Sequence, residues 1–181
     1  MLRKPLASAL LAATLAGFST ASQATQFNDC ITAAVATDLA AKTAFQTALR
    51  DLLVREKPGF RGLANLNMDL QIALAQSRQT RLVHLVHTDP SRLAAGGDIS
   101  QLSNFDWTSE DAARLAQADS HHRKLADNIL KLTQRNNGHP QWPELRRYFA
   151  EVLATLPEFT AIMANLRDGR RKAEQQLQIC R

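Results

Sequence analysis

The sequence predicts an all-α protein, an antiparallel up-and-down four-helix bundle whose N- and C-terminal ends are joined by a disulfide. Apolar residues recur every three or four positions almost throughout, as on one face of an α-helix. Proline, glycine and asparagine interrupt this pattern at only a few places. The two cysteines of the chain, Cys30 and Cys180, lie near its opposite ends, which four alternating helices bring together.

Residues 1–24 are predicted to be a signal peptide that is cleaved after export. Arg3 and Lys4 precede an apolar stretch of about 13 residues, and small residues follow at the positions that a signal peptidase recognises. This stretch is shorter than the roughly 20 residues of a membrane-spanning helix. We therefore expect one domain over residues 25–181, periplasmic or secreted, with neither a membrane span nor a lipid anchor.

The first two helices are delimited by proline. The first is predicted to run from Phe27 to Lys57-Pro58-Gly59, which ends it. The second carries an apolar stripe from Leu63 and ends at Thr88-Asp89-Pro90, because the residue before proline disfavours the helical conformation. Residues 89–108 are predicted to be irregular.

The third helix is predicted to begin at Trp107-Thr108-Ser109, where a hydroxyl can cap free amides, and to end at Asn136-Asn137-Gly138. Pro143 suits the first turn of a fourth helix, which extends to the C-terminus. Pro157 interrupts the stripe of this last helix, so we expect it to be kinked or split there.

Composition and motifs favour a binding role over catalysis. The net charge is +5 for the whole chain and +3 without residues 1–24, which is far from the dense basic stripe of a nucleic-acid-binding protein. The chain carries no motif for covalent haem, a zinc protease, a nucleophilic serine or a phosphate-binding loop. We predict no cofactor and no nucleic-acid partner.

The histidines do not predict a metal site. His84 and His87 lie near the end of the second helix, whereas His121 and His122 lie about 12 residues into the third. A rise of 1.5 Å per residue then places the second pair roughly 18 Å from the start of its helix, too far from the first pair to share one ion. Each pair alone offers too few ligands for zinc.

A polar layer is predicted inside the bundle, because several charged residues fall on the apolar stripes at heights of roughly 9–22 Å above the disulfide. These residues are Asp38, Lys42, Arg81, His122, Arg170 and Glu174. Buried charges require partners or a ligand, and the excess of positive charge favours an anionic small molecule. The alternative is a set of boundary residues joined by one or two salt bridges.

Basic residues are also expected at the end of the bundle opposite the disulfide. They are Arg50, Arg55, Lys57, Arg61, Lys131, Arg135, Arg146 and Arg147. Trp142 with Arg146 and Arg147 is a candidate surface for a protein partner. Alternatively, Trp142 packs on its own helix and the arginines form a solvated face.

Two functional hypotheses follow. The first is an exported, non-catalytic protein that binds another envelope protein, as an inhibitor, an immunity factor or an accessory subunit. The second is a small helical enzyme or sensor that binds an anionic metabolite in the polar layer.

Overall fold

The all-α prediction is confirmed. The computed structural model describes residues 18–89, 92 and 107–180, with the backbone alone for 18–24, and no β-strand occurs among them. The helices are α1 (Phe18–Glu56), α2 (Arg61–Thr88), α4 (Ser109–Ala118), α5 (Ser120–Asn137), α6 (Trp142–Glu151) and α7 (Pro157–Ile179), with 3₁₀ turns η1 (Pro58–Phe60) and η3 (Leu153–Thr155). Within the described residues, no helix is both long and apolar enough to cross a membrane.

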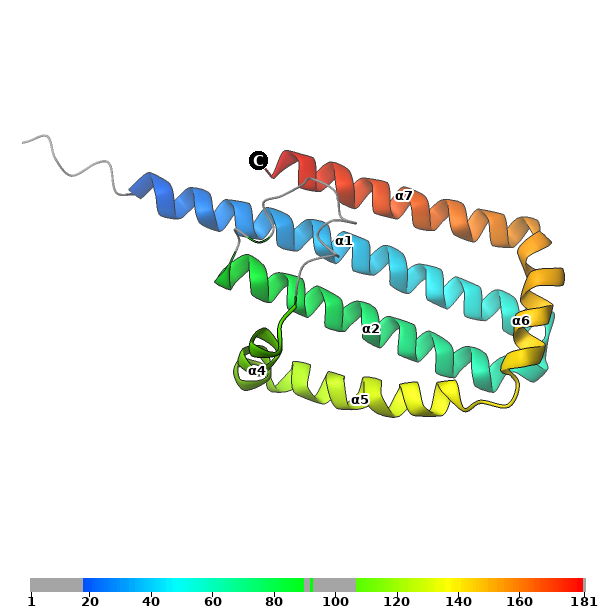
Figure 1. Ribbon diagram of the computed structural model, residues 1–181. Coiled ribbons are helices and arrows are strands. Elements are labelled where there is room, and N and C mark those ends of the chain that lie inside the picture. Colours follow the sequence, from blue (N-terminus) through cyan, green and yellow to red (C-terminus); the bar gives the residue numbers. More distant parts are fainter. Residues whose placement is uncertain (1–17, 90–91, 93–106, 181) are drawn as a thin grey trace, which may run out of the picture.

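The long helices lie side by side in a row, in the order α7, α1, α2, α5, and successive helices of the row run in opposite directions (Figure 1). Helix α1 packs against both α7 and α2, and α2 packs against α5 on its other side. The outer helices are therefore α5 and α7. The expected alternation of direction is present, but a closed four-helix bundle is not confirmed.

The predicted third helix is divided at Asp119, which the sequence analysis did not anticipate. Asp119 has an extended backbone, and its Oδ1 accepts hydrogen bonds from the backbone N–H groups of His121 and His122 at 2.8 and 3.0 Å. An aspartate that caps a new helix in this way competes with continuation of the preceding one. The result is a short α4, capped at its start by Thr108 as expected, and a separate α5.

The split of the last predicted helix is confirmed. Pro143 lies in the first turn of α6, η3 follows, and Pro157 opens α7. Figure 1 shows α6 lying across the end of the row, so that α7 returns along α1. Proline is tolerated in a first turn, where its missing N–H has no partner within the helix in any case.

The disulfide between Cys30 and Cys180 is also confirmed, with 5.6 Å between the two Cα atoms. It joins α1 to the end of α7 beside a core that we call the disulfide-end core. This core comprises Ile31, Ala34, Val35, Leu82, Leu85, Val86, Ala173, Leu177 and Cys180. A far-end core comprises Leu52, Leu53, Phe60, Leu63, Ala64, Leu145 and Leu153. A third cluster fills the contact between α2 and α5.

Candidate anion-binding seam

Asp38 is the buried carboxylate around which part of the predicted polar layer assembles. It lies on α1, one turn beyond Ala34 of the disulfide-end core, and is only 9 % exposed. Lys42, a further turn along α1, donates a hydrogen bond from Nζ to Asp38 Oδ2. From α7, Arg170 Nε lies 3.8 Å from Asp38 Oδ1. Asp38 and its two direct partners are thus three of the six residues that were predicted to form the layer, and Arg81 is a fourth in the same cluster.

Arg170 reaches Asp38 because its neighbour in the chain is a glycine. A Cβ atom on Gly169 would lie 2.5 Å from the Cβ of Ala41 on α1, a distance that real Cβ atoms do not adopt. The absent side chain lets α7 approach α1 closely at this level. Arg170 is then held beside the α1 face that carries Asp38.

The contact between Arg170 and Asp38 is an ion pair without a hydrogen bond. The distance of 3.8 Å exceeds the usual 2.7–3.2 Å of an N–H···O bond. Both Arg170 Nε and Asp38 Oδ1 are buried and have no hydrogen-bond partner within the described chain. Buried polar atoms are normally satisfied, so these two unsatisfied atoms mark a place where a ligand could supply a partner.

Arg78, on α2, adds a second guanidinium to this cluster. Burial lowers the pKa of Arg78, the attraction of Asp38 opposes this shift, and the repulsion of Arg170 reinforces it. These electrostatic interactions place Arg78 near both residues, although it comes from a different helix. Three helices therefore contribute charge to one place.

Arg81 continues the cationic cluster along α2. Burial, followed by repulsion from Arg78, lowers its pKa. Its Nε donates to the Ser77 carbonyl at 3.4 Å, and its guanidinium carbon lies 5.7 Å from the centroid of the Trp107 ring. The aromatic ring partly stabilises this cation.

We call this cluster the seam, because it lies where α1, α2 and α7 meet. It comprises Asp38, Lys42, Arg78, Arg81 and Arg170. Lys42 and Arg170 contact the carboxylate of Asp38 directly, Arg78 interacts with it electrostatically, and Arg81 interacts with Arg78. Desolvated cations are costly without compensating negative charge.

His122 and Glu174 form no hydrogen bond or ion pair with the seam among the described residues, and His122 interacts with it only electrostatically, through Arg81. His122 is buried on α5, on the other side of α2, and its Nδ1 has no hydrogen-bond partner in the described part of the chain. Its burial lowers its pKa, which Asp119 opposes and Arg81, His121 and His84 reinforce. Glu174 is half-buried on α7, one turn from Arg170.

The height predicted for His122 is wrong, and the break at Asp119 is the reason. His122 lies in the first turn of α5 instead of the middle of a long helix. It is consequently close enough to His84 of α2 to interact electrostatically with it. Among the described residues, no group of three or more potential metal-binding side chains occurs.

Of the three residues predicted to form a partner surface at the far end, only the two arginines are exposed. Trp142 packs on the far-end core, and its Nε1 donates a hydrogen bond to the Asn136 carbonyl. Arg146 is exposed and lies over the Trp142 ring, with 6.0 Å between the guanidinium carbon and the ring centroid. Arg147 is exposed. The tryptophan thus has a structural role, whereas both arginines face solvent.

Several of the other basic residues at this end are paired. Arg55 forms an ion pair with Glu158, and Lys57 forms one with Glu144 at 2.7 Å. Lys57 Nζ also lies 4.8 Å from the centre of the Phe60 ring. These pairs link α1 and the turn after it to α6 and α7.

The sequence analysis missed Arg78, although the chain carried a signal for it. Leu74, Arg78, Arg81 and Leu85 follow one another at spacings of four, three and four, which place all of them on one face of α2. A helical-wheel projection centred on this face of α2 would have placed Arg78 in the predicted polar layer together with Arg81.

No family model, curated protein or solved structure matches this chain in the three comparisons. Function must therefore be inferred from the chemistry of the residues themselves.

Proposed function

We propose that this is an exported binding protein that holds a small anionic molecule, through a carboxylate or phosphate group, in the seam. The observation that carries the proposal is the gathering of cationic side chains around Asp38, where Arg170 Nε is buried without a hydrogen-bond partner in the described part of the chain. Lys42 and Arg170 approach this carboxylate directly, and Arg78 interacts with it electrostatically. Arg170 Nε and Asp38 Oδ1 both lack a hydrogen-bond partner among the described residues, and a bound anion would bring negative charge and acceptor oxygens to the guanidinium of Arg170.

The types of cation in the seam suit such a ligand. Guanidinium groups form paired, parallel hydrogen bonds with carboxylates and phosphates, and three of the four seam cations are arginines. The Arg170 side chain is 40 % exposed, so its outer nitrogens remain accessible to a ligand that enters from solvent. Asp38 would orient the cations while the ligand neutralises them.

Export is part of the proposal and has two supports. The first 24 residues have the character of a signal peptide. The disulfide between Cys30 and Cys180 is of a kind that persists in oxidising compartments such as the periplasm or the extracellular space.

A thermal-shift panel of citrate, succinate, phosphate and sodium chloride at equal ionic strength tests anion binding. An anion at 100 times its dissociation constant adds about 2.7 kcal/mol to stability, which raises Tm by roughly 5–10 °C for a chain of this size. We expect Arg170→Gln to reduce this shift strongly. Arg171→Gln is the matched control, because Arg171 is the adjacent residue of α7 and pairs on the surface with Asp168. Equal shifts in both variants, or no shift beyond that of chloride, would refute the proposal.

A second candidate function is the binding of another envelope protein at the far end. The exposed Arg146 and Arg147 favour it, because these adjacent cations face solvent in the middle of α6, outside the turns where the helix dipole acts, and arginine is frequent at protein interfaces. Charge reversal of both residues to glutamate would abolish cross-linking to such a partner. Cross-linking that survives the double reversal would count against this surface.

A further inference from the structure

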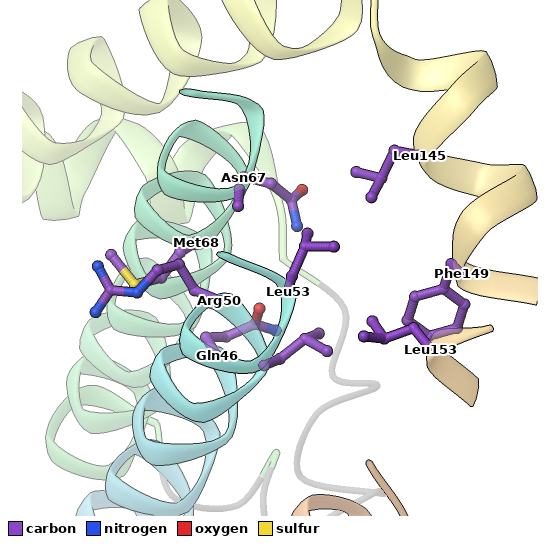
Figure 2. A pocket seen from close by; sticks show the side chains of 10 residues that line it. Gln46, Arg50, Leu53, Asn67, Met68, Leu145, Phe149 and Leu153 are labelled. Atoms are coloured by element: carbon purple, nitrogen blue, oxygen red, sulfur yellow. The ribbon is translucent and has the colours of Figure 1, made fainter. Parts of the chain in front are cut away.

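A cavity lies between α1, α2 and the segment formed by α6 and η3, at the far end of the row. Its volume is about 100 Å³. Leu145, Phe149 and Leu153 form one side of it, and the side chains of Gln46 and Asn67 face them from the opposite side (Figure 2). The cavity therefore has one apolar wall and one wall that carries two primary amides.

The two amides are the polar groups available to a ligand. Gln46 comes from α1 and Asn67 from α2, and both side chains are half-buried. Neither amide makes a hydrogen bond to another residue within the described part of the chain. Each one offers two N–H donors and a carbonyl acceptor, so the pair can satisfy a ligand group that both donates and accepts.

Arg50 is the one charged residue in the lining, and its charge is already neutralised. Its Nε lies 2.6 Å from Asp51 Oδ1, and its Nη1 donates to Asn65 Oδ1 at 3.3 Å. Figure 2 shows its guanidinium beside Met68, on the side away from Phe149. The one cation of the lining thus already has a carboxylate beside it, and its guanidinium lies away from the apolar wall.

The volume limits the size of the ligand. An enclosed apolar cavity of 150 Å³ accommodates benzene, whereas this one, of about 100 Å³, is open to solvent. A ligand of about the size of benzene therefore fits only if part of it remains at the mouth. A predominantly apolar lining with a few polar groups that fix orientation is typical of small-molecule sites.

We propose that this cavity binds a small uncharged amide with a short branched aliphatic body. The aliphatic part packs against Leu145, Phe149 and Leu153, while the amide of the ligand exchanges hydrogen bonds with Gln46 and Asn67. This site is independent of the seam in both position and chemistry.

Isobutyramide, titrated into the full-length, isotopically labelled protein, is the direct probe. The side-chain NH₂ signals of Gln46 and Asn67 are expected to shift and to saturate with a dissociation constant in the millimolar range. Isobutyrate has the same shape but a negative charge, and we expect it to bind here at least tenfold more weakly because no free cation faces it. Unmoved Gln46 and Asn67 signals, or equal shifts with isobutyrate, would overturn the proposal.

Substitution separates a binding role from a structural one. Asn67→Leu keeps the number and branching of the side-chain heavy atoms but removes one amide, and it should weaken isobutyramide binding about tenfold. Gln71→Leu is the control, because Gln71 is a half-buried amide one turn further along α2 that does not line the cavity. Gln46→Leu provides a second test if Asn67→Leu fails to fold. Unchanged binding in Gln46→Leu or Asn67→Leu, or an equal loss in Gln71→Leu, would contradict the assignment.

Discussion

The seam and the far-end cavity both lie between α1 and α2, yet they differ in charge and in how they are held. Helices α1, α2 and α7 build the seam, next to a core that the Cys30–Cys180 disulfide closes. The cavity is lined by α1 and α2 together with the short elements α6 and η3, and no disulfide ties these to the rest. Buried charges tolerate little displacement. The chain places its densest charge where a covalent bond and a close helix contact fix the geometry.

Removal of the disulfide should have the largest effect and should affect the seam first. The bond closes a loop of 150 residues, and its loss in Cys30→Ser/Cys180→Ser should reduce the free energy of unfolding by up to about 5 kcal/mol. Urea denaturation measures this loss, and wild type in reductant is the control. We expect anion binding to weaken while isobutyramide binding persists in the folded fraction. A decrease of less than about 1 kcal/mol in the free energy of unfolding would contradict the stabilising role of the disulfide.

Leu153→Ala should affect the opposite end. Leu153 is fully buried in the far-end core and also lines the cavity. Truncation of a buried leucine costs about 3 kcal/mol, because it loses apolar contacts and leaves a void. Urea denaturation combined with the anion panel should show reduced stability but unchanged anion affinity. A matching loss of anion affinity would show that the two regions are not separate.

Gly169→Ala should disturb the seam at a smaller cost. The new methyl group would collide with Ala41, and overpacking of this kind costs about 1–3 kcal/mol. The separation of α7 from α1 should also weaken anion binding. Gly62→Ala, within α2, is the control. No atom lies within 4 Å of the methyl group that it introduces, so it should stabilise by about 0.5–1 kcal/mol. If both variants changed the free energy of unfolding in the same direction, the close approach of α7 to α1 at Gly169 would be contradicted.

The smallest effect concerns pH. Burial lowers the pKa of His122 in the folded protein, so the unfolded chain binds its proton more readily. The contribution of neutral His122 is therefore complete well above the ordinary value of about 6.5 and is lost as pH falls below it. Urea midpoints measured between pH 7.5 and 5.5 should therefore fall with pH, and His122→Asn should make this fall smaller. His87→Asn is the control, because His87 is exposed and its replacement should leave the fall unchanged.

Local signals in the sequence predicted most of the fold. Helix periodicity, the prolines at 58, 143 and 157, and the two cysteines were sufficient for the helices, the split last segment and the disulfide. Asp119 was missed because a capping aspartate within a periodic stretch resembles an ordinary surface acid. That one residue changed the position of His122. The row of helices was not predictable, because periodicity identifies an apolar face but not the helix that covers it.

The candidate site was predicted in part for the same reason. Asp38, Lys42 and Arg170 lie on faces that the stripes define, and the structure brings them together. Glu174 lies on the same stripe of α7, but its contacts depend on the rotation and tilt of that helix. Trp142 was ambiguous because its indole can either anchor a partner or bond to its own chain, and it donates to Asn136. The cavity had no sequence signal, since Gln46 and Asn67 resemble ordinary boundary residues.

A crystal structure of the protein with saturating citrate, or with the anion that most raises Tm, would test the seam most directly. We predict ligand oxygens within about 3 Å of the guanidinium nitrogens of Arg78 and Arg170, with Lys42 still bonded to Asp38. An anion bound elsewhere, with the seam occupied by water alone, would contradict the account.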